Sequence, residues 1–493
     1  MDKLVIFFLI FFILGFLFFS FRITDVPPGI NGDEAAIGYN AALVARTGHD
    51  SSGRFFPLFV SAFDLTDWKQ PITFYSTALA FKIFGPSYTL LRQVSVVFVL
   101  ISTMLIFLLA KETLDLKAAF LSMFIFITIP AVLIQSHLAL ENIAPVPFTV
   151  FWLLMLAKYQ KTLEQKYLYL TGFFLGIDWF TYPGMRIIFP VFFLLSLGFI
   201  FYLNRTKKFM AVVSLWIRFA LIALFFPLLM WLVKNQYPGA ILAYNRPHTI
   251  SSYQDFFTSY ISSFDPSFLF ITGDITPYHS TGKQGVFLLA TLPLFILGII
   301  KIIRKKDLML NFIVLTFFLT PALYGLVGTI HRGSRLLALL PSYALIATVG
   351  VLSLTAVKNK IGKFILISIV FLLILLNYAD FLRDYFWQYP QRVKSDFAKP
   401  YQLVFEKAAI MAKSTHLSLY IQSDFRSQNQ IAVDFFAQTL SDKIENWKED
   451  QAIPPSSIII VSDYILSKKK EIPQVNIGEG FGLLINQTKN EIR

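Results

Sequence analysis

The sequence contains no cysteine, and only 15% of its 493 residues carry a charge. The absence of cysteine excludes disulfide bonds, catalysis by a thiolate and metal sites built on cysteine ligands. Charged residues make up roughly 25% of an ordinary soluble domain, so this chain has unusually few. Hydrophobic residues instead account for 56% of the chain, and its mean hydropathy is +0.62. These values predict a polytopic α-helical membrane protein.

Apolar runs recur along the chain and are long enough to cross a bilayer core of roughly 30 Å. We predict about eleven transmembrane helices, because hydrophobic stretches of this length favour membrane spans. Their approximate bounds are 4–21, 88–109, 118–136, 143–157, 167–182, 187–203, 211–233, 285–303, 309–328, 336–356 and 364–382. The first run lacks the small-residue cleavage site of a signal peptide, so we expect it to remain as a helix.

Basic residues give the chain a formal net charge of +13, which in a soluble protein would suggest a nucleic-acid partner. Here most of them fall in short loops that share one side of the predicted bundle. They are Lys111, Lys117, Lys158, Lys161, Lys166, Arg205, Lys207, Lys208, Arg304, Lys305, Lys306, Lys358, Lys360 and Lys363. Membrane topology explains this pattern without a nucleic acid and predicts that this side and the N-terminus are cytoplasmic. The polar segment 22–87, the loop 234–284 and the C-terminal region are then extracytoplasmic, in a protein of the plasma membrane.

Residues 383–493 are more polar than the rest of the chain. They contain two β-branched runs and two helix-like stretches, at 417–421, 457–461, 401–412 and 430–440. This alternation predicts a small extracytoplasmic α/β domain. It has neither a glycine-rich phosphate loop nor the spacing of a catalytic triad, so we interpret it as an accessory domain. The catalytic transmembrane domain is predicted to span residues 1–382.

Two adjacent acids, Asp33 and Glu34, follow a Pro-Pro-Gly turn after the first apolar run. A carboxylate close to hydrocarbon is costly without a partner, which favours a catalytic role, with Asp33 as a general base for a hydroxyl or amine. The alternative is that these acids cap a helix predicted over 35–45. An amphipathic surface helix is predicted over 72–84. Glu141, in the turn after the third span, is a further catalytic candidate or an ordinary turn carboxylate.

Four basic residues on the predicted outer side are candidate ligands of a phosphate: Lys69, Arg92, Arg332 and Arg335. For Lys69, the alternative is snorkelling to lipid headgroups. For Arg92, near the outer end of its span, the alternative is membrane anchoring. The stretch 331–335 is the densest basic cluster on this side. Because that density opposes the positive-inside bias, it favours a specific anionic partner.

These elements, in this order, resemble the GT-C superfamily of membrane glycosyltransferases, and within it the protein O-mannosyltransferases and lipid A aminoarabinose transferases. The resemblance rests on the Asp-Glu pair, on Lys69 in a Lys-x-Pro motif, on an aromatic helix ending in Phe84-Gly85, and on Arg92 at the start of the second span. It covers about residues 25–200, extends more weakly over 331–345, and does not include the C-terminal region. It implies a GT-C-like fold and an inverting transfer of a hexosyl or pentosyl group from a polyprenyl-phosphate donor to a protein, lipid or glycan acceptor.

The resemblance also implies roles for individual residues. The family's catalytic base corresponds to Asp33 and its adjoining acid to Glu34, while the lysine of its Lys-Pro-Pro motif corresponds to Lys69. Gln70 stands where the family has the first of those prolines. Glu141 stands where many members have aspartate. The basic residue that contacts the lipid phosphate corresponds to one of two arginines, Arg332 or Arg335.

The alternative function is a transporter or flippase of lipid-linked precursors. Transporters tend to place ionisable residues near the bilayer centre, whereas the spans here are almost free of charge and the acids crowd the outer surface. This favours the enzyme. A membrane anchor for the C-terminal domain would not need so many spans. No cofactor is indicated, and a requirement for a divalent cation stays open. A metal site of His137 or His331 with Glu34 finds no support in the spacing of these residues.

Overall fold

The structure is a computed structural model that describes residues 3–62, 67–240, 252–328, 330–356, 358–397, 399–428, 430–440, 444–478 and 480–487. The chain forms two compact units. The first, which we call the helical unit, comprises Met1–Phe21, Leu65–Thr73 and Arg92–Tyr389. The second, the mixed unit, comprises Arg22–Asp64, Phe74–Leu91 and Pro390–Arg493. The segment that carries Asp33 and Glu34 therefore belongs to the same unit as the C-terminal region.

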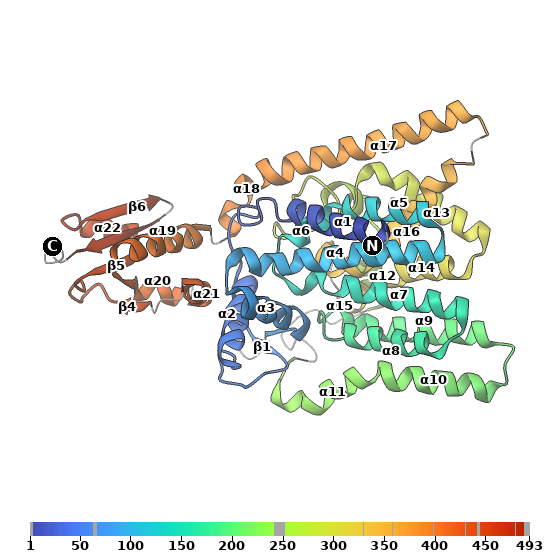
Figure 1. The fold of residues 1–493 in the computed structure, drawn as a ribbon, viewed down its shortest axis with the longest axis horizontal. Helices are drawn as coiled ribbons and strands as arrows, with labels where there is room; N and C mark the ends of the chain where they lie inside the picture. The colour runs from blue at the N-terminus through green and yellow to red at the C-terminus, as the bar shows by residue number, and fades with distance from the viewer. Residues whose placement is uncertain are drawn as a thin grey trace. The chain divides into compact units, whose positions relative to one another are not determined.

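The helical unit consists of apolar helices that lie alongside one another (Figure 1). Its main helices are α1 (Lys3–Phe19), α4 (Tyr88–Thr113, which begins in the mixed unit), α5 (Leu116–Ile127), α6 (Pro130–Ser136), α7 (Pro145–Thr162), α8 (Gln165–Asp178), α9 (Met185–Asn204), α10 (Phe209–Ala223), α11 (Phe225–Val233), α12 (Tyr253–Ser262), α13 (Leu292–Lys305), α14 (Leu308–Leu319), α15 (Ala322–Val327), α16 (Leu340–Leu354) and α17 (Lys360–Arg383). Short 3-10 turns η1 (Glu141–Ile143), η5 (Gly333–Arg335) and η6 (Leu337–Leu339) join some of them. Because these helices are apolar over most of their length, their packing fits a membrane-embedded bundle.

Six stretches of the described chain are long and apolar enough to cross a membrane. They are Tyr88–Thr113, Glu141–Thr162, Met185–Asn204, Leu308–Val327, Leu337–Leu354 and Lys360–Arg392. Two bent helix pairs, α5 with α6 (63°) and α10 with α11 (41°), raise the number to eight if each pair is one span. The other predicted spans coincide with α1, α8 and α13, which have 17, 14 and 14 residues. The predicted positions are therefore helical, but the predicted total of eleven is not confirmed.

The mixed unit contains a five-stranded sheet near the end of the chain, as the β-branched runs predict. Its elements are α2 (Gly32–Thr47), α3 (Pro71–Phe84, whose first turn lies in the helical unit), α18 (Tyr389–Arg392), α19 (Lys399–Thr415), β3 (Ser418–Gln422), α20 (Ser423–Gln428), α21 (Gln430–Leu440), β4 (Glu445–Trp447), β5 (Ser457–Ser462), α22 (Asp463–Lys468), β6 (Gln474–Gly478) and β7 (Phe481–Asn486). The strand order is β4-β3-β5-β7-β6, with β3 parallel to β4 and β5, and with β7 antiparallel to β5 and β6. The first five residues of β5 are buried, because this central strand is covered on both faces.

Helix α2 packs against helix α21 of the C-terminal region. Gly38 makes the close approach possible, because a Cβ at this position would collide with the ring of Phe435. The predicted helices at 35–45 and 72–84 are confirmed as α2 and α3. The helix that carries the two candidate acids is therefore packed in part by a region that the sequence suggested was only an accessory domain.

Candidate active site

The start of α2 is held by a reciprocal pair of hydrogen bonds. The backbone N–H of Glu34 donates to Oδ1 of Asn31 (2.9 Å), and the backbone N–H of Asn31 donates to Oε2 of Glu34 (3.1 Å). This capping box sets Asn31 as the N-cap, so the helix begins earlier than a start at either acid would imply. Glu34 is fully buried, and its carboxylate stabilises the helix end. Asp33 is half-buried in the same first turn, at the positive end of the helix dipole.

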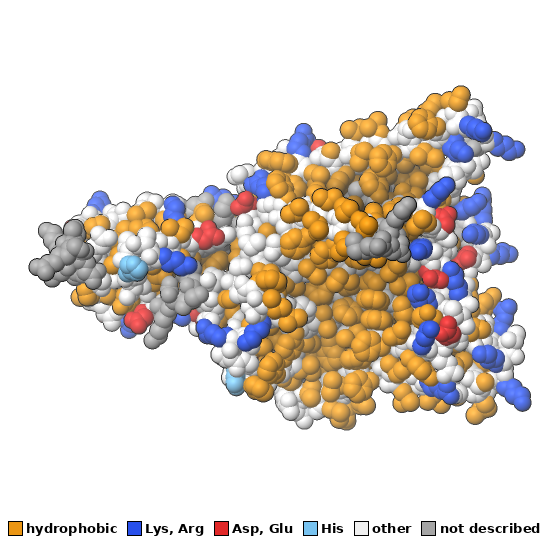
Figure 2. Space-filling view, in the orientation of Figure 1, with side chains coloured by type: hydrophobic (Ala, Val, Ile, Leu, Met, Phe, Trp, Pro, Cys, Tyr) orange, Lys and Arg blue, Asp and Glu red, His pale blue; other side chains and the backbone are white. Residues whose placement is uncertain are grey.

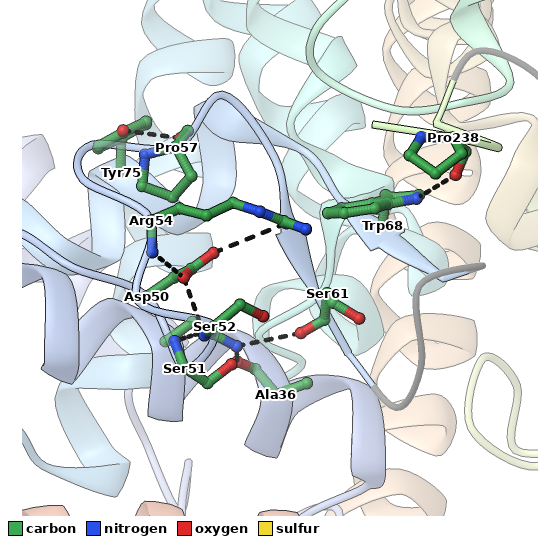
Figure 3. Close-up of polar contacts among 11 residues, drawn as sticks. Ala36, Asp50, Ser51, Ser52, Arg54, Pro57, Ser61, Trp68, Tyr75 and Pro238 are labelled. Atoms are coloured by element: carbon green, nitrogen blue, oxygen red, sulfur yellow. Dashed lines mark hydrogen bonds and ion pairs between the residues drawn. The ribbon is translucent and has the colours of Figure 1, made fainter. Parts of the chain in front are cut away.

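The loop after α2 folds back onto the helix through Asn40, which is fully buried. The amide nitrogen of Asn40 donates to the carbonyls of Ala36 (3.0 Å) and Ser61 (3.2 Å), and its amide oxygen accepts from the backbone N–H of Ser51 (3.0 Å). Figure 3 shows Ala36, Ser51 and Ser61 gathered at this point. One side chain thus fixes both ends of the loop to the middle of α2.

Asp50 shapes the turn within this loop. Its Oδ1 accepts hydrogen bonds from the backbone N–H groups of Ser52 and Arg54, each at 2.9 Å (Figure 3). The hydroxyl of Tyr75, on α3, donates to the carbonyl of Pro57 at 2.8 Å. The loop therefore connects α2 to α3, and these contacts hold the segment around Asp33 in a defined geometry.

A second group of polar residues lies in the helical unit and centres on Glu141. Glu141 opens η1, and its carboxylate accepts a hydrogen bond from the backbone N–H of Gln70. Gln70 directly follows β2 (Trp68–Lys69), in which the indole of Trp68 donates to the carbonyl of Pro238 at 2.7 Å (Figure 3). Lys69 is only 6% exposed, and its Nζ lies 3.1 Å from Oδ2 of Asp67. A lysine this buried does not fit the alternative of snorkelling to lipid headgroups.

Arg186 joins this group and was not predicted as a site residue. It is buried at the start of α9 and donates to the side-chain oxygen of Gln70 and to the carbonyl of Ala240. Its Nε donates to the carbonyl of Trp179 at 3.4 Å. The sequence shows Arg186 only as a lone cation at the outer end of a predicted span. That position also suits a membrane anchor, so the pattern gave no specific signal.

Asn142, the neighbour of Glu141, reaches the late basic cluster. Its amide nitrogen donates to the carbonyl of Ser334 at 3.0 Å, and the backbone N–H of Ser334 donates to Oδ2 of Asp274 at 3.0 Å. Ser334 lies in η5, the turn that ends at Arg335 and has Arg332 as its N-cap residue. Two adjacent residues of η1 thus connect the segment that carries Lys69 to the turn that carries the two arginines. Sequence reasoning missed Asn142 and Asp274.

Buried polar atoms without partners lie in the same region. The Nε of Arg332 and the hydroxyl of Tyr324 are buried, and neither has a hydrogen-bond partner among the described residues. Tyr324 lies within electrostatic range of Arg332, Arg335 and Asp274. A buried donor without an acceptor costs about 1–3 kcal/mol, so these groups suit the binding of an acceptor-rich anion such as a phosphate.

Arg92 and the two histidines occupy other positions. Arg92 is fully buried in α4, which argues against anchoring in lipid headgroups. His137 is buried, with its ring centroid 5.5 Å from that of Tyr385. The Nε2 of His331 lies 3.1 Å from Oδ2 of Asp265. Within the described ranges, no group of three or more His, Asp or Glu side chains could hold a metal ion.

Residues 69–231 match the family of dolichyl-phosphate-mannose-protein mannosyltransferases. The match spans β2 to α11 and so includes Lys69, Gln70, Glu141 and Arg186. A search of curated proteins finds no match. The family match, which covers a third of the chain, supports a resemblance to membrane mannosyltransferases.

Solved structures show the same fold at low sequence identity. ArnT from Cupriavidus metallidurans, in a crystal structure bound to undecaprenyl phosphate, has 10% identity and a TM-score of 0.55, with 97% of each chain covered. Its apo structure gives 10% identity and a TM-score of 0.53, with 98% of each chain covered. The oligosaccharyltransferase AglB from Archaeoglobus fulgidus, in complex with an inhibitory peptide and a dolichol-phosphate, has 10% identity and a TM-score of 0.50, covering 94% of this chain and 70% of AglB. The protein is therefore a multi-pass membrane protein with a GT-C fold, and it resembles mannosyltransferases and ArnT.

Proposed function

We propose that this protein is an integral-membrane glycosyltransferase that moves a sugar from a polyprenyl-phosphate donor to an acceptor outside the cytoplasm. The observation that carries the proposal is the link through η1. Glu141 binds the segment of Lys69, and Asn142 binds the turn of Arg332 and Arg335. These two contacts connect the segments that carry Lys69, Arg332 and Arg335, whose side chains suit the binding of a phosphate. ArnT, which has a similar fold, has been solved with undecaprenyl phosphate bound. Lys69, Arg332 and Arg335 are the proposed ligands of the donor phosphate, with Arg92 supporting them.

The proposed reaction is a displacement at the anomeric carbon of the donor sugar. The acceptor oxygen or nitrogen forms a bond to this carbon while the bond from the carbon to the phosphate oxygen breaks, which inverts the configuration. Asp33 takes the proton of the acceptor, and the electron pair of the broken bond leaves with the polyprenyl phosphate. The basic residues stabilise the negative charge that develops on this leaving group. Glu34 caps α2 and so orients Asp33, and Glu141 positions the residues around Gln70.

A panel of polyprenyl-phosphate sugars, incubated with the purified protein and candidate acceptors in detergent, tests this activity. We expect one donor to be consumed with formation of a glycosylated product. A transporter or flippase would make no new bond, so the chemical assay separates the two functions. The acceptor class follows from which protein, lipid or glycan becomes labelled.

Asp33→Asn tests the catalytic base. Asparagine keeps the size of the side chain and can cap a helix, but it cannot accept the proton, so turnover should fall by about 10²–10⁴-fold. Asp25→Asn is the control, because Asp25 lies in the same segment with its side chain 57% exposed. Glu34→Gln should cost less, since glutamine preserves a capping box. Near-normal sugar transfer by Asp33→Asn would contradict the assignment.

The orientation of the protein in the membrane is also a proposal. Basic residues end or follow α4, α7, α9, α13 and α16, namely Lys111, Lys161, Lys207, Lys305 and Lys358. Figure 2 shows Lys and Arg gathered where several helices of the helical unit end, whereas its flanks are hydrophobic. We propose that this cation-rich end is cytoplasmic and that the segment of Asp33 is extracytoplasmic. A reporter that is active only in the cytoplasm, fused after Arg493, should then stay silent. An active fusion would contradict this orientation.

A further inference from the structure

Helices α13 and α16 are in direct backbone contact over part of their length. A Cβ at Gly298 would collide with the carbonyl oxygen of Ile346, and a Cβ at Gly350 would collide with that of Leu294. Glycine at these positions lets the two helices approach more closely than larger side chains would allow. Beyond this contact, towards the end of α13, the two helices border a hollow of about 490 Å³.

One face of α13 forms most of the lining of this hollow. The lining residues are Leu297, Ile300, Lys301, Arg304 and Lys305 of α13, together with Ser353 of α16. The five residues of α13 follow the i, i+3, i+4, i+7, i+8 spacing of a single helix face. We call this surface the α13 groove. Its apolar residues come first and its three basic residues follow, over a length of about 12 Å.

Membrane topology and the helix dipole explain why cations lie at this end of α13, since both favour positive charge there. Neither explains why the cations border a hollow that is also lined by the apolar residues Leu297 and Ile300. Leu297 and Ile300 are 38% and 41% exposed, so the apolar part is open to the surroundings of the helix. Among the described residues, no salt bridge satisfies Lys301, Arg304 or Lys305.

We propose that the α13 groove binds an anionic phospholipid from the leaflet at the cation-rich end of the helical unit. The order of the lining residues matches the order of groups in such a lipid. One acyl chain lies along Leu297 and Ile300, while the phosphate reaches the three cations. Basic pockets between membrane helices at this level suit anionic headgroups, and each cation near the surface contributes on the order of 1 kcal/mol. The site is separate from the proposed sugar-transfer chemistry and serves as a structural lipid site.

Lipid binding to the purified full-length protein in detergent, measured by native mass spectrometry, tests the proposal. Phosphatidylglycerol and phosphatidylcholine with identical acyl chains are the probes. We expect the unmodified protein to prefer phosphatidylglycerol roughly tenfold or more, and the triple variant K301Q/R304Q/K305Q to lose this preference. The matched control K358Q/K360Q/K363Q removes the same charge at the same end, outside the groove, and should keep it. Equal loss in both triple variants, or no preference in the unmodified protein, would overturn the proposal.

Two further measurements keep the test decisive. Soluble glycerol 3-phosphate carries the headgroup chemistry without acyl chains and should not displace phosphatidylglycerol at equal concentration. Displacement would show that a free phosphate is the ligand and would overturn the lipid site. If the triple variant does not fold, the single variants Lys301→Gln and Arg304→Gln replace it, each with an expected loss of roughly fivefold in preference. An unchanged preference in both single variants would contradict the proposal.

Discussion

Basic residues of the helical unit occupy two settings: some are buried around η1, and others are exposed in short loops. Burial distinguishes residues that could belong to a binding site from residues that only follow the positive-inside rule. Around η1, Arg186 and Lys69 are buried and engaged by named carbonyl or carboxylate groups. At the cation-rich end, Lys161 and Lys207 are exposed, and the short loops there carry many such residues. In the sequence, both sets appear only as basic residues beside apolar runs.

Burial changes what a cation does. A buried guanidinium must find hydrogen-bond acceptors, so its neighbours become fixed, and removing it leaves those acceptors without a donor. An exposed lysine keeps much of its hydration, and water and salt screen any ion pair it forms, so it holds its neighbours only weakly. We therefore expect the two settings to respond very differently to the same substitution.

Arg186→Ala should produce the largest effect on stability. It leaves the carbonyl of Ala240 and the side-chain oxygen of Gln70 without their donor. At about 1–3 kcal/mol for each buried group, the free energy of unfolding should fall by about 2–6 kcal/mol. Chemical denaturation of the purified protein in detergent measures the loss.

Lys207→Ala is the matched control for this experiment, because it removes an exposed cation from the other setting. The free energy of unfolding of this variant should differ from that of the unmodified protein by no more than about 0.5 kcal/mol. If Arg186→Ala and Lys207→Ala destabilise the protein equally, burial does not distinguish the two settings.

The sequence predicts features of the fold that depend on residues close together along the chain, but not contacts between residues far apart in it. Apolar runs predict where the helices lie, and β-branched runs predict β3 and β5, because both signals are local. The capping box of Asn31 and Glu34 is local as well, yet the adjacent acids Asp33 and Glu34 also fit a catalytic pair, so the sequence leaves capping as an alternative. The hydrogen bonds show that Glu34 caps α2, which is one of the two alternatives for this residue, and its catalytic role stays a prediction.

The contacts around η1 could not be predicted in this way. Gln70 and Glu141 are 71 residues apart, Gln70 and Arg186 are 116 apart, and Asn142 and Ser334 are 192 apart. Such pairs form only when helices pack, and spacing in one sequence carries no information about them. This is why Glu141 was a candidate without a partner and why Arg186 and Asn142 were missed.

Arg332→Ala and Arg335→Ala should have an intermediate effect, on ligand binding rather than on stability. If these residues bind the donor phosphate, each substitution should weaken donor affinity by about 1.5–3 kcal/mol, the range for hydrogen bonds to charged groups. Titration of the purified variants with the donor identified from the panel measures this. Lys358→Ala, at the cation-rich end, should leave donor affinity unchanged. Unchanged affinity in both arginine variants would remove the turn from the proposed site.

Apart from the control Lys207→Ala, Glu112→Gln should have the smallest effect, because it tests ion pairs at the cation-rich end. The carboxylate of Glu112, at the end of α4, lies 2.9 Å from Nζ of Lys161 and 3.6 Å from Nζ of Lys158, both on α7. The side chain of Lys161 is 56% exposed, so water and salt screen the attraction. Ion pairs of this kind contribute about 0.2–1 kcal/mol to the free energy of unfolding. The difference in this free energy between Glu112→Gln and the unmodified protein should therefore become smaller as salt is added. If the free energy of unfolding instead falls by more than about 2 kcal/mol at every salt concentration, the ion pairs of Glu112 are as stabilising as the buried contacts around η1.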